Sequence, residues 1–160
     1  MSAGARPWRL ALIVCGAVVV LDQVAKAAIV AGLDPGERID IALGLELARV
    51  SNTGVAFGLL AGGGEVLVLA VTLLALALLA TLFAREPERP YGWLAVGLIA
   101  GGALGNLADR VRDGAVVDYI DPPMWPAFNV ADIAITCGVA LLLLVQVQRE
   151  RAAARESPPE

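Results

Sequence analysis

The sequence predicts an all-α membrane protein with four transmembrane helices and a small extracytoplasmic β-hairpin or β-sheet element. The first reason is composition: 58% of the 160 residues are hydrophobic, and the mean hydropathy is +0.74. Soluble domains are about 45–50% apolar, and so small a globule cannot bury the excess. Second, four segments approach the ~20 mostly apolar residues that a bilayer crossing requires. Third, Trp8, Trp93 and Trp125 fall at the ends of these segments, where interfacial tryptophans are enriched.

The four predicted spans belong to one membrane domain covering residues 1–160. They lie at about 10–31, 65–84, 93–108 and 128–147. The third span is short and contains Gly97, Gly101 and Gly105, and small residues spaced by four permit close approach of helices. Residues 148–160 are charged and contain proline, so we expect a frayed cytoplasmic tail.

The connection over about residues 32–64 is predicted to form the β element. Ile39, Ile41 and Leu43 alternate with polar or small residues, and the alternation resumes at Leu45. This pattern predicts a hairpin with one apolar face. Such a hairpin could rest on the membrane edge or cover a site.

Basic residues are unevenly distributed between the two sides of the predicted bundle. One side carries seven, which are Arg6, Arg9, Arg85, Arg89, Arg149, Arg151 and Arg155. The other side carries four in longer loops, which are Arg38, Arg49, Arg110 and Arg112. The positive-inside rule therefore predicts that both termini are cytoplasmic and that the longer loops are extracytoplasmic.

Several function classes are excluded by what the sequence lacks. It has no histidine, which removes Ser-His and Cys-His nucleophilic systems and His-based metal sites. Cys15 and Cys137 lie in apolar runs, where a thiol is inert. The net charge of −4 gives no basic footprint for nucleic acid. We therefore expect neither a metal nor a cofactor.

Two carboxylates lie where an apolar chain rarely carries them. Asp118 lies between the third and fourth spans, and Asp132 lies at the start of the fourth. A carboxylate near lipid is costly to ionise and by default indicates function. Two carboxylates that flank one helix entrance can share a proton and perform acid–base chemistry. The alternative is a polar cluster that only holds helices together, and spacing does not decide between the two.

Polar residues also occur on the first span and after the predicted hairpin. Asp22 and Lys26 are four residues apart and share a helix face. They either neutralise each other or line a polar cavity. Asn52 is either a turn former or a hydrogen-bond donor into a site, and the nearby Gly54 permits tight backbone geometry.

A third polar group closes the third span. Asn106, Asp109 and Arg110 have the i, i+3 and i+4 spacing of one helix face. They form either a solvated helix end or part of a site, in which Arg110 would favour the charged forms of nearby acids. Asn129 precedes Asp132 by three residues at the head of the fourth helix, which we expect to begin near residue 128.

Five motifs occur in order along residues 10 to about 147. They are Asp22-Gln23-x-x-Lys26, Asn52-Thr53-Gly54-Val55-Ala56-Phe57-Gly58, Gly101-Gly102-Ala103-Leu104-Gly105-Asn106-Leu107-Ala108-Asp109-Arg110, Val116-Val117-Asp118-Tyr119 and Phe128-Asn129-Val130-Ala131-Asp132. Together they resemble the bacterial lipoprotein signal peptidases, also called signal peptidase II. Each motif is weak alone, but five in order are specific.

The resemblance implies an aspartic endopeptidase of the bacterial inner membrane. That family removes signal peptides from prolipoproteins, cutting just before a cysteine that carries diacylglyceryl. Asp118 and Asp132 match its catalytic pair. Polar residues that line its site are matched by Asp22, Asn52, Asn106, Arg110 and Asn129, and the same motifs contain Lys26, Gly54 and Asp109. The implied partners are prolipoproteins and membrane lipids, and we expect a monomer. The Pro-rich stretch between the two acids is shorter than in many members, which bears on the shape of the outer lid.

Two other classes remain as alternatives on the residues alone. A small transporter or proton conductor would use Asp22, Lys26 and Asp132 as a relay. However, a relay needs polar groups at several depths, and the inner halves of the predicted spans are almost wholly apolar. A non-enzymatic scaffold is the second alternative, and it would tolerate Asp118→Asn and Asp132→Asn.

Overall fold

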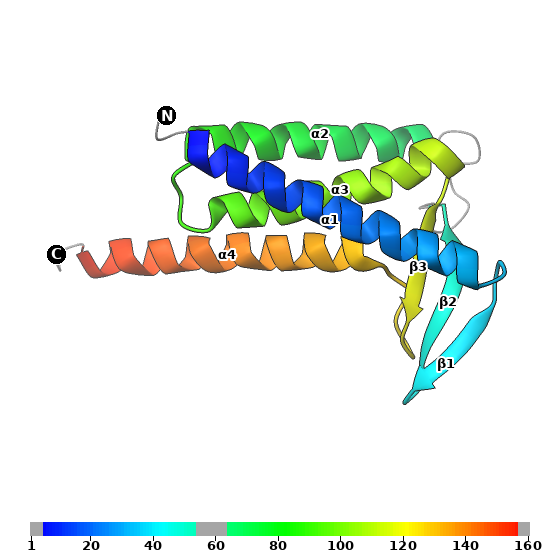
Figure 1. Cartoon of the computed structure of the whole chain (residues 1–160). Helices are drawn as coiled ribbons and strands as arrows, with labels where there is room; N and C mark the ends of the chain where they lie inside the picture. The colour runs from blue at the N-terminus through cyan, green and yellow to red at the C-terminus, as the bar shows by residue number, and fades with distance from the viewer. Residues whose placement is uncertain (1–4, 54–63, 157–160) are drawn as a thin grey trace.

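The computed structural model describes residues 5–53 and 64–156. Within them, four helices form an elongated bundle and a three-stranded sheet lies at one end of it (Figure 1). The elements in chain order are α1 (Ala5–Gly32), β1 (Arg38–Ala42), β2 (Leu45–Asn52), α2 (Gly64–Arg85), α3 (Gly92–Asp113), β3 (Val116–Asp121) and α4 (Val130–Glu156). The start of α1 and the end of α4 lie at the end of the bundle opposite the sheet.

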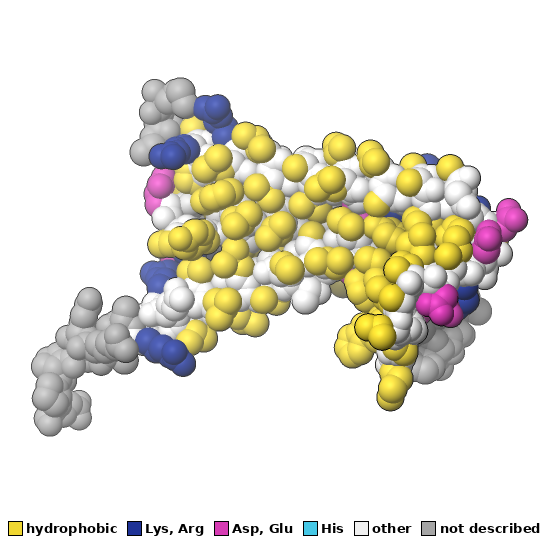
Figure 2. Space-filling view, turned by 60° about the horizontal axis from the view of Figure 1, so that its bottom comes forward, with side chains coloured by type: hydrophobic (Ala, Val, Ile, Leu, Met, Phe, Trp, Pro, Cys, Tyr) yellow, Lys and Arg dark blue, Asp and Glu magenta, His cyan; other side chains and the backbone are white. Residues whose placement is uncertain are grey.

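The four helices are long and apolar enough to cross a membrane. Their large apolar side chains point outward, as at Leu12, Leu74 and Leu143, which are 66%, 70% and 62% exposed. Figure 2 shows this apolar surface as a band over the helices, with Lys and Arg side chains at the end opposite the sheet. The predicted four-helix membrane fold with a small β element is therefore confirmed.

Glycines bring α3 close to both α1 and α4. A Cβ atom built on Gly97 would lie 2.7 Å from the Cβ of Val14, and one on Gly101 would lie 2.7 Å from the Cβ of Val18. On α4, a Cβ atom built on Gly138 would lie 2.6 Å from an Ile99 side-chain carbon. No larger residue fits at these contacts without separating the helices, which is how small residues drive packing in membranes.

The predicted hairpin is present as β1 and β2, joined by a two-residue turn. Leu43 and Gly44 both have positive φ, 56° and 80°, as a type I′ turn requires. β3 extends the hairpin into an antiparallel sheet of order β1-β2-β3 and places Asp118 opposite Val50. Asp118, which the sequence places between the third and fourth spans, therefore lies in a strand. The sequence pattern did not predict β3 because all of its residues are buried or half-buried, so the strand lacks an apolar–polar alternation.

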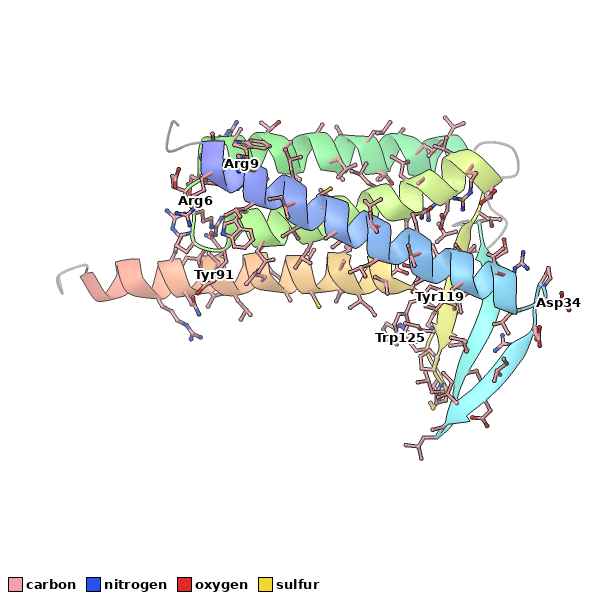
Figure 3. The ribbon with its side chains drawn as sticks, in the orientation of Figure 1. Arg6, Arg9, Asp34, Tyr91, Tyr119 and Trp125 are labelled. Atoms are coloured by element: carbon pink, nitrogen blue, oxygen red, sulfur yellow. The ribbon has the colours of Figure 1, made fainter. Side chains whose placement is uncertain are left out.

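The sheet is fixed to the end of α1. Arg49 donates hydrogen bonds through Nη1 to the carbonyl oxygens of Leu33 and Val30, at 2.9 and 3.3 Å, where a helix leaves its last carbonyls unpaired. Beneath the sheet, Ile29, Leu33 and Tyr119 form a buried apolar cluster. Figure 3 shows Tyr119 at this end of the bundle. These contacts hold β3 against the helices.

Three predicted boundaries are corrected. α3 continues to Asp113 rather than ending near residue 108, and Gly114 closes it in a left-handed conformation with φ 72°. α4 begins at Val130, two residues later than expected. The tail predicted to fray from residue 148 is helical to Glu156, because residues 148–156 contain only Gln, Arg, Glu and Ala, all strong helix formers.

Candidate functional site

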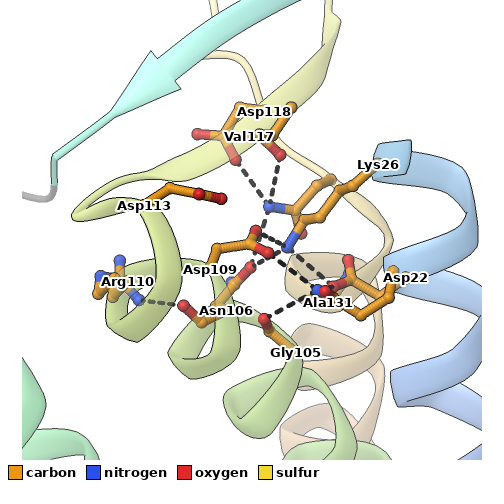
Figure 4. Close-up of polar contacts among 12 residues, drawn as sticks. Asp22, Lys26, Gly105, Asn106, Asp109, Arg110, Asp113, Val117, Asp118 and Ala131 are labelled. Carbon is orange, nitrogen blue, oxygen red and sulfur yellow. Dashed lines mark hydrogen bonds and ion pairs between the residues drawn. The ribbon is translucent and has the colours of Figure 1, made fainter. Parts of the chain in front are cut away.

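The sheet end of the bundle contains a cluster of buried polar side chains. The members buried to 6% exposure or less are Asp22, Lys26, Asn106, Asp109, Asp118 and Asn129. They come from α1, α3, β3 and the residue before α4, and Figure 4 shows several of them converging. The structure thus brings together residues that the sequence placed more than 100 positions apart. Buried polar groups are costly unless each has a partner, so their contacts define what the cluster can do.

Lys26 neutralises two carboxylates at the base of the cluster. Its Nζ lies 2.8 Å from Asp22 Oδ2 and 2.7 Å from Asp109 Oδ2, and it donates a hydrogen bond to Asn106 Oδ1 at 2.8 Å. The predicted i, i+4 pairing of Asp22 with Lys26 is confirmed, and Asp109 joins it from α3. Because these charges are fully desolvated, each depends on the others.

Asp22 also fixes the start of α4. Its Oδ1 accepts a hydrogen bond from the backbone N–H of Ala131 at 3.1 Å, one of the amides that a helix N-terminus leaves unpaired. Gln23, which was not predicted as a site residue, donates to Asp109 Oδ1 at 2.9 Å. Its position beside Asp22 in the first motif was the available signal. α1 is thereby tied to both α3 and α4.

Asn129 and Asp132 cap α4 reciprocally. The Asn129 backbone N–H donates to Asp132 Oδ2, and the Asp132 backbone N–H donates to Asn129 Oδ1, both at 3.1 Å. This is a capping box formed by the residue before the helix and the third residue within it. Asn106 adds a donor from α3, with its Nδ2 2.9 Å from Asp132 Oδ1. Asp132 is therefore held in place by N–H donors at the N-terminus of α4.

Asp118 reaches the cluster from β3 and is 2% exposed. Its Oδ1 accepts from Asn129 Nδ2 at 2.7 Å, and its Oδ2 accepts from Asn52 Nδ2 at 2.9 Å. Burial raises the pKa of Asp118, and the neighbouring Asp132 raises it further, while the hydrogen bonds from Asn52 and Asn129 and the charge of Lys26 oppose this shift. Of the two interpretations that the sequence left open for Asn52, this hydrogen bond to Asp118 favours the donor.

The four acids of the cluster divide into two kinds by their partners. Asp22 and Asp109 pair with the ammonium of Lys26. Within the described part of the chain, the partners given for Asp118 and Asp132 are neutral amides and backbone N–H groups. Asn129 contacts both of the latter, so it links them directly. Two linked acids that form no ion pair among the described residues can hold one shared proton and exchange it.

Arg110, one of the predicted site residues, stands apart from the acid pair. Arg110 donates to the backbone oxygen of Asn106 at 3.4 Å and not to either acid of the pair, and Figure 4 shows it directed away from Asp118. The cation beside the acids is Lys26 instead. Gly54 lies outside the described residues. Among those described, no three His, Cys, Asp or Glu side chains converge in a metal-binding group.

The fold and the cluster define a multi-pass membrane enzyme with buried carboxylates at one end of its helices. A family described as signal peptidase (SPase) II matches residues 14–148. The chain therefore belongs to the signal peptidase II family of membrane aspartic peptidases.

Relatives and solved structures agree with this assignment. The lipoprotein signal peptidase of Syntrophomonas wolfei is 46% identical over 80% of this chain and 86% of its own length. That of Moorella thermoacetica is 43% identical over 78% and 84%. A bacterial membrane enzyme solved by the in meso method superposes with a TM-score of 0.79 at 29% identity, over 94% of each chain.

Proposed function

We propose that this chain removes signal peptides from diacylglyceryl-modified prolipoproteins, cutting before the lipid-modified cysteine, with Asp118 and Asp132 as the catalytic pair. The relatives named lipoprotein signal peptidases support the substrate class. The observation that carries the residue assignment is that the four acids of the cluster have two different kinds of partner. Lys26 pairs with Asp22 and Asp109, whereas Asn129 bridges Asp118 and Asp132 with neutral donors.

In the resting pair, Asp118 is protonated and Asp132 is ionised. Burial raises the pKa of Asp118, which supports placing the shared proton on this acid. Asp132 takes a proton from water as the water oxygen bonds to the scissile carbonyl carbon. Asp118 gives its proton to the carbonyl oxygen, which forms a neutral diol.

Collapse of the diol completes the reaction. Asp132 returns its proton to the leaving nitrogen, the C–N bond breaks, and Asp118 recovers a proton from a diol hydroxyl. The pair ends in its starting state, and no side chain becomes acylated. The titration of the two acids is coupled, so two apparent pKa values belong to the pair.

The remaining cluster residues hold the two acids in position. Asn52, Asn106 and Asn129 orient the carboxylates through hydrogen bonds. The ion pairs of Lys26 with Asp22 and Asp109 join α1 to α3. Roles for Gly54 and Arg110 on the substrate side rest on the sequence resemblance.

We also propose that both termini are cytoplasmic and that the site faces the extracytoplasmic side. The basic end of the bundle is opposite the sheet (Figure 2), as the positive-inside rule requires. A membrane-impermeant thiol reagent tests this in a background lacking Cys15 and Cys137. Asp34→Cys beside the sheet should be labelled in intact cells, and Glu88→Cys between α2 and α3 only after lysis. The reverse pattern would overturn the orientation.

Cleavage by the purified enzyme tests the activity and its residues. A prolipoprotein carrying diacylglyceryl should be cut, and the same precursor without the lipid should not. Asp118→Asn and Asp132→Asn should abolish cleavage, while Asp113→Asn, which removes a 49% exposed carboxylate at the same end, should preserve it. A transporter or scaffold would cleave neither precursor.

A further inference from the structure

A cavity lies between helices at the end of the bundle opposite the sheet. It measures about 400 Å³ and is walled by apolar side chains of α2, α3 and α4, including Leu79, Phe83, Val96 and Leu143. The crevice exists because α2 packs on α3, whereas no described residue of α2 has its Cα within 8 Å of α4. Trp8 of α1 packs against Phe83, one of the lining residues, with its ring centroid 4.8 Å from that of Phe83.

The rim of this crevice carries two arginines without acidic partners. Its polar lining residues are Arg85, Glu86, Arg89 and Gln146. The charge of Glu86 is already neutralised, because its carboxylate pairs with Arg149. None of the ion pairs among the described residues includes Arg85 or Arg89. The rim therefore has two uncompensated positive charges above an apolar wall.

One donor inside the crevice lacks an acceptor. Arg89 donates through Nη2 to Gln146 Oε1 at 2.5 Å, which fixes the guanidinium between α3 and α4. Its Nε is buried and has no hydrogen-bond partner among the described residues. A buried N–H without an acceptor is costly, and a guanidinium offers parallel donors that match a phosphate.

We propose that this crevice binds an anionic phospholipid of the leaflet surrounding that end of the bundle. Its phosphate lies on Arg85 and Arg89, and an acyl chain lies against Leu79, Phe83 and Leu143. Basic pockets between transmembrane helices bind anionic lipid headgroups in this way. A free phosphate would leave the apolar wall uncovered, and a neutral lipid would leave the rim charge unmatched. The bound lipid fills the gap between α2 and α4 and stabilises the position of α2.

Lipid binding to the purified full-length protein in detergent tests this proposal, with native mass spectrometry as the readout. Phosphatidylglycerol should bind more tightly than phosphatidylcholine of the same acyl chains. Arg85→Gln combined with Arg89→Gln should weaken phosphatidylglycerol binding roughly 30-fold, which is about 2 kcal/mol at 1.4 kcal/mol per tenfold. The matched control is Arg6→Gln combined with Arg9→Gln, which removes two exposed charges at the same end (Figure 3) and should retain the preference.

A second pair of variants tests the apolar wall without changing charge. Leu143→Trp should obstruct the crevice and weaken binding, whereas Leu144→Trp should not. The two leucines are neighbours and are 62% and 60% exposed, but only Leu143 lines the crevice. The proposal is overturned by equal losses in both arginine pairs, by unchanged binding in Leu143→Trp, or by displacement of the lipid with equimolar inorganic phosphate.

Discussion

Replacing Lys26 with methionine should destabilise the protein more than any single surface change. Lys26 is 2% exposed, and Asp22 and Asp109 are fully buried. Its Nζ lies 2.8 and 2.7 Å from the two carboxylates, where each contact amounts to about 6 kcal/mol at an effective dielectric constant of 20. Desolvation offsets most of that attraction. Among the described residues, removing the cation leaves buried Asp22 without an ionic partner and Asp109 with only the 3.3 Å contact to Arg112, so the expected loss is about 3–5 kcal/mol.

Thermal unfolding of the purified protein in detergent, followed by tryptophan fluorescence, measures this loss. At about 2–4 °C per kcal/mol, the Tm of Lys26→Met should fall by roughly 6–20 °C. Adding Asp109→Asn should recover part of it, because that change removes one of the stranded charges. The matched control is Arg38→Met, whose ion pairs with Glu46 and Asp121 involve a 53% exposed side chain and contribute about 0–1 kcal/mol.

The reasoning would be refuted if Lys26→Met lowered the Tm no more than Arg38→Met. It would also be refuted if Asp109→Asn made the Lys26→Met variant still less stable. Either result would show that the ion pairs do not join α1 to α3.

Three further predictions concern packing and protonation. Gly101→Ala should lower the Tm because the added Cβ would lie 2.7 Å from the Val18 Cβ. Gly16→Ala is the control, since Gly16 has open space around it, and it should be neutral or stabilising by up to about 1 kcal/mol. Equal Tm values for the two variants would contradict the close packing of α1 and α3. Asn52→Ala removes a hydrogen bond that lowers the pKa of Asp118. The alkaline limb of the kcat/KM–pH profile should therefore move to higher pH. An alkaline limb that stays in place or moves to lower pH would count against a protonated Asp118 in the active enzyme. The raised pKa of Asp118 means that the folded protein holds this proton more tightly than the unfolded chain does. Protonation of Asp118 therefore contributes fully to stability below its ordinary pKa of 3.8. That contribution falls as the pH rises through the pKa of Asp118 in the folded protein. Unfolding measured against pH should show this decline in the wild type and a smaller one in Asp118→Asn.

Hydropathy predicted the membrane spans because a helix that crosses lipid must consist mostly of apolar residues. A helix must present apolar side chains around most of its surface, and the runs that do so are conspicuous in the sequence. Charged residues inside such runs stand out for the same reason, and Asp22 and Lys26 were recognised in this way. Boundaries were less predictable, since caps such as Gly114 and Asn129 depend on local hydrogen bonds rather than on hydropathy.

The identity of the catalytic acids could not be predicted from spacing. All four acids lie near the ends of apolar segments, and nothing local indicates which of them meets Lys26. That pairing depends on the close approach of α1 and α3 at Gly97 and Gly101. The strand carrying Asp118 was likewise hidden, because its pattern depends on what covers each face of the sheet. The family resemblance supplied the assignment, and the contacts of Lys26 and Asn129 give it a physical basis.

The central claim is that Asp118 and Asp132 act as one proton-sharing pair. The most direct measurement is single-turnover cleavage of a diacylglyceryl-prolipoprotein by Asp118→Asn, Asp132→Asn and the double variant, each checked for a wild-type-like Tm. General acid–base groups contribute about 10²–10⁴-fold, and residues acting as a unit are non-additive. We predict that each single variant loses at least about 10²-fold and that the double variant loses little more. Cleavage near the wild-type rate in either single variant, or losses that multiply in the double variant, would contradict the claim.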